Sequence, residues 1–167
     1  PGTTTVGEIG DDTPLERMAE YTSGGDKLHM CYAFEFLSSS PLTAEWVAAT
    51  LARTAEVAPE GWPCWAFSNH DVVRVASRWA VDGKPDPEQA KLLAALVTSL
   101  RGTAFMYQGE ELGLTEADIP FELLQDPFGI FLWPEDKGRD GCRTPFPWDG
   151  QKANAGFSSA KTTKASG

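Results

Sequence analysis

The feature that most constrains the fold of this sequence is a regular alternation of short apolar segments with helical segments. Four segments are rich in apolar, aromatic and β-branched residues without strict alternation, which is typical of strands buried on both faces. They are residues 3–9, 28–36, 64–69 and 103–108. Because helical patterns lie between them, the sequence predicts an α/β protein built from parallel βα units.

The sequence predicts four helices, over residues 15–21, 43–59, 72–79 and 86–102. The last of these has the clearest start signals. Asp86 can cap the helix, Pro87 occupies the first helical position, and Gln89 completes a D-x-x-Q capping box.

The pattern changes after the fourth apolar segment. Residues 114–147 contain five prolines and several aromatic residues without a long periodicity, and a loop of this length is usually functional. We therefore predict one domain over residues 1–150, in which 114–147 form a long loop. Residues 151–167 are small and polar, and they are expected to fray.

Composition narrows the range of partners. The 167 residues carry a net charge of −10, which argues against binding to nucleic acid or to an anionic membrane surface. No apolar run is long enough to span a membrane. The dispersed cysteines Cys31, Cys64 and Cys142 indicate free thiols in a reducing compartment, so a cytoplasmic location is expected. We expect no zinc and no redox cofactor in this chain.

Titratable residues follow the predicted strands. Glu8 lies near the end of the first strand, and His70 and Asp71 come directly after the third. In a barrel of parallel strands these ends converge on one face, so Glu8 and Asp71 would reach the same pocket. Two carboxylates across a pocket can act as an acid and as a stabilising anion. Alternatively, each acid caps the helix that follows it, as Asp71 could do.

Four motifs, in this order, resemble conserved motifs of the α-amylase superfamily, glycoside hydrolase family 13. They are TVGEI (5–9), FSNHDVVR (67–74), GTAFMYQGEELG (102–113) and GRDGCRTPFPWDG (138–150). The last resembles a signature of the α-glucosidase and oligo-1,6-glucosidase branch. The resemblance covers residues 3–159 and implies a partial (β/α)8 TIM barrel. It would contain the fifth to eighth strands and lack the first half and the C-terminal β-sandwich.

The resemblance also implies roles for three of these residues. Glu8 would be the general acid/base. Asp71 would be the carboxylate that binds sugar hydroxyls in the distorted transition state, and His70 would hydrogen-bond the same glucose. The structural alternative for His70 is a satisfied core histidine.

Further residues are implied at the edge of the site. Arg139, or less favourably Arg143, would contact the non-reducing end of the glucose. Phe34 and Glu116 are candidates for the neighbouring subsite that binds the leaving group or acceptor. Alternatively, Arg143 pins its loop by ion pairing and Phe34 belongs to the barrel core. Glu111 is interpreted as structural.

One element of the family pattern is missing. Such an enzyme retains the anomeric configuration through a covalent intermediate on a carboxylate about 5–5.5 Å from the acid/base. The family carries that nucleophile in a G-F-R-x-D motif after the fourth strand, and this sequence contains no such motif. The sequence is therefore interpreted as a fragment of a retaining α-glucosidase, inactive alone, whose partner is the missing N-terminal half of the barrel. Calcium could bind to that half.

The expected activity is hydrolysis, with transfer, of α-linked glucose from short substrates such as maltose or sucrose. Oligo-1,6-glucosidase, sucrose isomerase and trehalose synthase activities remain alternatives within the resemblance. A remote alternative is the catalytically inactive ectodomain of a transporter subunit of the same fold. The presence of Glu8, His70 and Asp71 favours an enzyme.

Overall fold

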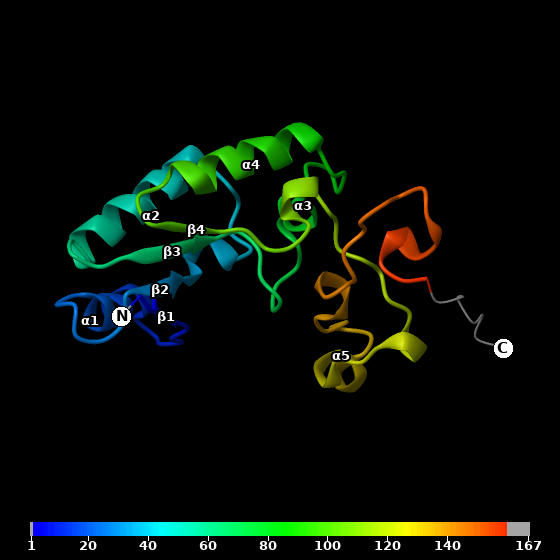
Figure 1. The fold of residues 1–167 in the computed structure, drawn as a ribbon, viewed down its shortest axis with the longest axis horizontal. Coiled ribbons are helices and arrows are strands. Elements are labelled where there is room, and N and C mark those ends of the chain that lie inside the picture. Colours follow the sequence, from blue (N-terminus) through cyan, green and yellow to red (C-terminus); the bar gives the residue numbers. More distant parts are fainter. Residues whose placement is uncertain (1, 160–167) are drawn as a thin grey trace. The chain divides into compact units, whose positions relative to one another are not determined.

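The computed structural model describes residues 2–159, which divide into unit 1, up to Thr115, and unit 2, from Glu116 onward. Unit 1 contains four strands and four α-helices (Figure 1). In chain order these are β1 (Val6–Gly7), α1 (Pro14–Thr22), β2 (Met30–Ala33), α2 (Ala44–Val57), β3 (Pro63–Ala66), α3 (Val75–Arg78), α4 (Pro87–Ser99) and β4 (Thr103–Phe105). Two short 3₁₀-helices, η1 (Phe34–Leu37) and η2 (Glu110–Leu112), follow β2 and β4.

The four strands form one sheet in the order β1-β2-β3-β4, and every pair is parallel. The predicted α/β class with parallel strands is thus confirmed. Each strand pairs with its predecessor in sequence, as in a section of a (β/α) barrel, whereas doubly wound sheets reverse their strand order at a switch point. All four strands therefore end at the same edge of the sheet.

The two long helices begin where the sequence predicted. The Thr43 hydroxyl accepts a hydrogen bond from the Trp46 amide at 3.1 Å at the start of α2. The Asp86 carboxylate accepts one from the Glu88 amide at 2.9 Å at the start of α4. The second half of the predicted capping box is wrong, because the Gln89 side chain donates to the Trp79 carbonyl at 2.6 Å instead.

Several other elements are shorter than predicted. β1 has two residues where 3–9 were expected, and β2 ends at Ala33, where the chain turns into η1. The helix predicted over 72–79 is reduced to α3, because a tight turn occupies the residues before it.

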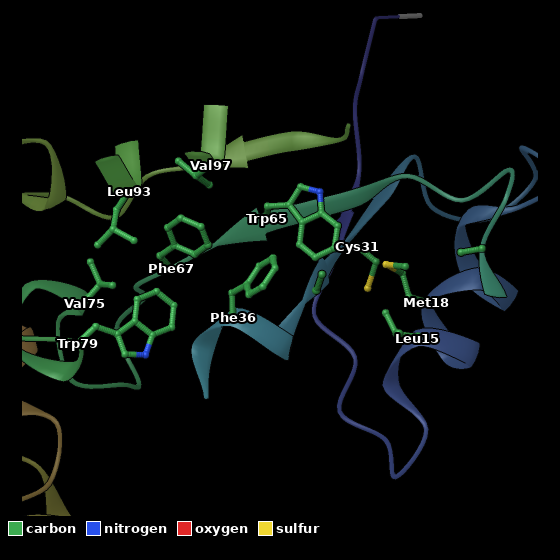
Figure 2. Packing of buried hydrophobic residues seen from close by; sticks show 12 residues of the cluster. Leu15, Met18, Cys31, Phe36, Trp65, Phe67, Val75, Trp79, Leu93 and Val97 are labelled. Atoms are coloured by element: carbon green, nitrogen blue, oxygen red, sulfur yellow. The ribbon is translucent and has the colours of Figure 1, made fainter. Parts of the chain in front are cut away.

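The helices of unit 1 pack on one face of the sheet and form its core (Figure 2). Phe36 is fully buried, with its ring centroid 5.2 Å from that of Trp65 and 5.4 Å from that of Phe67. Leu93 and Val97 of α4 belong to the same cluster, as the apolar stripe predicted. This packing holds the carboxyl ends of β2 and β3 in fixed positions.

The opposite face of the sheet is less well covered. The rings of Tyr32 and Phe105 meet edge to face at 5.1 Å, and both side chains are half-buried. Strand register places Val6 beside Met30 on this face, and Val6 is 42% exposed. Apolar side chains thus remain accessible on the face that would point into a barrel.

Unit 2 consists of loops joined by short helices. They are η3 (Phe121–Leu123), α5 (Pro127–Leu132), η4 (Asp140–Cys142) and η5 (Ala153–Gly156). Within residues 114–147, where a long loop is predicted, the chain forms η3, α5 and η4 with loops between them. The predicted fraying of the tail falls in part on residues 160–167, which lie outside the described residues. Within residues 2–159, no helix is long and apolar enough to cross a membrane.

Candidate active site

A pocket of about 270 Å³ lies at the carboxyl ends of β3 and β4 in unit 1. It is lined by Tyr32, Ser68, Asn69, His70, Ala104, Phe105, Met106 and Tyr107. Its walls combine aromatic rings with hydroxyl, amide and imidazole groups, which is the usual make-up of a site for a small polar ligand. Of the residues predicted from the sequence, His70 lines this pocket directly.

The turn after β3 is fixed by its own buried side chains. The Asn69 side-chain oxygen accepts hydrogen bonds from the amides of Asp71, at 2.8 Å, and Val72, at 3.1 Å. The Ser68 hydroxyl accepts a hydrogen bond from the Val75 amide at 2.8 Å. Asn69 and Ser68 are both buried. This turn explains why the chain leaves the strand at the S-N-H-D segment and presents the next two side chains outward.

His70 and Asp71 form a pair on this turn. The distance from His70 Nε2 to Asp71 Oδ2 is 3.3 Å, and their side chains are 57% and 36% exposed. The alternative of a core histidine is therefore wrong. Asp71 does not cap the following helix either, since the N-cap residue of α3 is Arg74.

Phe34 lies beside Tyr32, which lines the pocket. Burial raises the pKa of the Tyr32 hydroxyl, and the charge of Glu8 raises it further. The Phe34 ring centroid lies 6.1 Å from that of Tyr32. Phe34 is half-buried at the start of η1, where it stands outside the buried core cluster. The structure thus brings Phe34 and the His70–Asp71 pair near Tyr32 and the pocket, and Glu8 follows β1, the strand next to β2.

The other three predicted residues lie in unit 2, around η4. The Arg139 guanidinium donates from Nε and Nη2 to the two oxygens of Asp126, at 2.7 and 2.9 Å. Asp126 is fully buried, and these hydrogen bonds hold the pKa of its carboxyl well below the usual range. Arg143 is exposed at the end of η4. Glu116 is half-buried and lies against Gly141. A Cβ added to Gly141 would lie only 2.3 Å from Oε1 of Glu116.

A buried carboxyl group lies behind the pocket. Glu110 is 6% exposed, and burial raises its pKa to about 7 even though the Tyr107 amide donates to it at 3.2 Å. The nearby guanidinium groups of Arg78 and Arg74 oppose that shift only in part. Its neighbour Glu111 accepts a hydrogen bond from the Gly109 amide at 2.8 Å, and the structural role of Glu111 stays a prediction.

The three cysteines all lie inside the protein. Cys31, Cys64 and Cys142 are buried thiols, and burial raises the pKa of Cys64 to about 12. In the described part of the chain, no group of three His, Cys, Asp or Glu side chains is arranged to hold a metal ion.

Sequence reasoning missed two kinds of site residue. Tyr32 and Tyr107 line the pocket, and the position of each at the carboxyl end of a strand was the available signal. Arg74 and Arg78 lie behind the pocket. Charged side chains are usually expected at the protein surface, so their burial could not be predicted from the sequence.

The chain is similar to enzymes that share its parallel α/β fold. The sequence profile of the α-amylase catalytic domain matches residues 1–164, so the chain belongs to this family. The predicted family membership is confirmed. The predicted similarity to α-glucosidases and oligo-1,6-glucosidases is confirmed as well. The chain is 60% identical over 162 residues to a probable alpha-glucosidase of Rhizobium meliloti, and 34% identical over 182 residues to the oligo-1,6-glucosidase of Parageobacillus thermoglucosidasius.

A solved structure shows the same fold. The chain matches an alpha-glucosyl transfer enzyme, XgtA, with a TM-score of 0.89 and 50% identity, over 95% of this chain and 29% of that one. The matches to the two curated relatives cover 96% and 92% of this chain, but only 29% and 32% of theirs. The chain therefore spans about 30% of the length of these relatives and forms part of a catalytic domain.

Proposed function

We propose that this chain supplies one half of the active site of a retaining α-glucosidase. Strands β1 to β4 would be the fifth to eighth strands of the barrel. The observation that carries the proposal is the His70–Asp71 pair, 3.3 Å apart on a fixed turn beside the pocket. The similarity to glucosidases and to a glucosyl transfer enzyme supports a glucoside as substrate.

In this proposal Glu8 is the general acid/base. It protonates the glycosidic oxygen as the bond breaks, and it then takes a proton from the attacking water or sugar hydroxyl. The exposed position of Glu8 directly after β1 leaves its carboxyl group accessible to a ligand. Its place at the carboxyl end of β1, the strand that pairs with β2, supports a position on the same edge of the sheet as the pocket.

Asp71 and His70 would bind the glucose unit itself. The carboxylate of Asp71 accepts hydrogen bonds from sugar hydroxyls and stabilises the positive charge that develops on the ring in the transition state. The imidazole of His70 would hydrogen-bond the same unit. Phe34 and Glu116 are proposed for the neighbouring subsite, where an aromatic face and a carboxylate suit a second sugar.

Arg139, or less favourably Arg143, is proposed to contact the non-reducing end of the glucose. Nε and Nη2 of Arg139 donate to the buried Asp126, which orients the guanidinium on its loop. The Arg139 side chain is still 33% exposed, and Arg143 is exposed four residues later in the same motif.

The nucleophile is proposed to come from the first half of the barrel, which is the expected partner of this chain. The accessible face around Tyr32, Phe105 and Val6 supports this proposal, because a closed barrel fills its interior with such side chains. Short α-glucosides such as maltose or sucrose are the proposed substrates, with transfer as a side reaction. The buried thiols support a reducing, cytoplasmic location.

The test uses a protein in which residues 1–167 replace the matched segment of the Rhizobium meliloti relative, called the completed enzyme below. We expect it to hydrolyse maltose and p-nitrophenyl α-glucoside, and we expect Asp71→Asn to abolish both activities. Binding of glucose to the folded Asp71→Asn variant would be measured by calorimetry. A folded completed enzyme that releases no glucose, or an Asp71→Asn variant with full activity, would contradict the proposal.

A further inference from the structure

Two arginines, Arg74, which is buried, and Arg78, which is half-buried, follow Asp71 in the sequence but do not line the pocket. Arg74 is 2% exposed, and Arg78 lies in the last turn of α3. Transferring a guanidinium from water into the protein interior is costly, and apolar residues of similar size often stabilise a fold as well or better. Two such residues beside the pocket therefore suggest a role other than stability.

Arg78 binds three backbone carbonyls from three segments. Its Nη1 donates to Val73 at 2.7 Å, and its Nη2 donates to Phe36 at 3.0 Å and to Phe67 at 2.5 Å. Val73 belongs to the turn after Asp71, Phe36 belongs to η1 after β2, and Phe67 directly follows β3. One planar group thus joins the turn to two neighbouring strand ends.

Arg74 links the same turn to the segment that follows β4. Its Nη1 donates to the Gln108 carbonyl at 2.7 Å, and its guanidinium carbon lies 5.2 Å from the centre of the Tyr107 ring. Gly109 makes room for it, since an added Cβ there would lie 3.1 Å from Nη1. The turn is therefore joined to the segment that follows β4.

We infer that Arg74 and Arg78 are positioning residues that hold the His70–Asp71 turn between the ends of β2, β3 and β4. The planar guanidinium donates in several fixed directions at once, which the single ammonium of a lysine does not do. The inference deepens the proposed function and rests on it only for its catalytic consequence. If Asp71 acts in the transition state, a displacement of about 1 Å lowers turnover about 100-fold while ground-state binding changes less.

Kinetics of the completed enzyme test this consequence. We expect Arg78→Lys and Arg74→Lys to lower kcat about 10- to 100-fold, while KM changes by less than about threefold. The matched control is Arg101→Lys. Arg101 also donates to two carbonyls, of Gly61 and Pro59, and lies 5.4 Å from the Trp62 ring centre, but it does so before β4 starts. Unchanged kcat in both test variants would overturn the inference.

Hydrogen exchange of the 167-residue chain tests the positioning itself, without any activity. We expect Arg78→Lys to accelerate exchange of the Asp71, Val72 and Val75 amides at least about tenfold, while the Val97 amide in α4 keeps its rate. Equal acceleration at all four amides would mean a merely structural role and would overturn the inference. Local acceleration together with an inactive completed enzyme would uphold the positioning role and reject the proposed function.

Discussion

At the scale of single residues, the proposed reaction depends most on the carboxyl group of Glu8. Glu8→Gln keeps the shape of the side chain and removes both proton transfers. In the completed enzyme we expect a loss of about 10²–10⁴-fold on maltose, which has a poor leaving group. The loss in the glucosylation step should be smaller for an aryl glucoside, whose leaving group needs little protonation. Steady-state and single-turnover kinetics on the two substrates measure the difference.

Azide provides the control for this prediction, because it attacks the covalent intermediate without needing deprotonation. We expect azide to restore part of the turnover of Glu8→Gln on the aryl substrate. Glu60 is an exposed carboxylate that precedes β3, so it lies at the opposite end of that strand from His70, and Glu60→Gln should behave as wild type. Equal losses on both substrates, with no effect of azide and a lowered Tm, would remove Glu8 from the catalytic residues.

The buried carboxyl of Glu110 should make stability depend on pH. Its pKa is raised from 4.5 to about 7 by burial, against the opposing charges of Arg78 and Arg74 and with a small contribution from Glu111. The folded state therefore binds more protons than the unfolded state between these values, so stability is highest below pH 4.5 and falls as pH rises through 7. Relative to Glu110→Gln, we expect the free energy of unfolding of the wild type to fall by about 2–3 kcal/mol between pH 5 and pH 8.

Urea unfolding of the chain at the two pH values measures this loss. The exposed Glu60→Gln variant is the reference, since its stability should follow wild type at both values. If the free energies of unfolding of wild type and Glu110→Gln differ by the same amount at both pH values, Glu110 is ionised in the folded protein throughout this range.

At the scale of elements, the start of α4 depends on one side chain. Asp86 accepts a hydrogen bond from the Glu88 amide at 2.9 Å, and Pro87 fixes the first turn. Asp86→Ala removes the acceptor and should cost about 1 kcal/mol, or about 2–4 °C in Tm. Asp86→Asn keeps an acceptor oxygen and should cost much less. Equal losses for the two variants would mean that the cap is not the cause.

Helices were easier to predict than strands for a physical reason. Caps and apolar stripes are local signals, and they located α2 and α4 to within about three residues at each end. The length of a strand depends on its neighbours in the sheet, so the two-residue β1 could not be read from its apolar run. The helix α3 was overestimated because Asn69 and Ser68 bind the amides that a longer helix would have used.

For the candidate site, residue types could be predicted from the sequence, whereas contacts between distant segments could not. Glu8, His70 and Asp71 could be proposed because their residue types and motif positions appear directly in the sequence, and their roles stay predictions. The Arg139–Asp126 pair could not, since the two residues are 13 positions apart and only the folded loop brings them together. The contacts of Arg78 with three segments depend in the same way on tertiary structure.

At the scale of the whole molecule, the sheet is open in the described residues. β1 and β4 are edge strands that each pair on one side only. Unpaired edges and an accessible apolar face favour association with another sheet. The first half of the barrel would pair with the two edge strands and cover the apolar face. It would also supply the nucleophile.

The 167-residue chain alone is therefore expected to be inactive. We predict no turnover of p-nitrophenyl α-glucoside above background, because no family nucleophile motif occurs in the sequence. A chromogenic assay at high protein concentration measures this. Glucose release that is lost in Asp71→Asn would show instead that the chain contains its own nucleophile.

The central claim is that these residues serve a retaining glucosidase, and the stereochemistry of the product tests it most directly. Proton NMR of the completed enzyme, recorded during the first minutes of maltose or aryl glucoside hydrolysis, shows which anomer of glucose is released before mutarotation. Two successive displacements through a covalent intermediate predict that α-glucose appears first. Initial release of β-glucose would indicate a single displacement by water and would contradict the account.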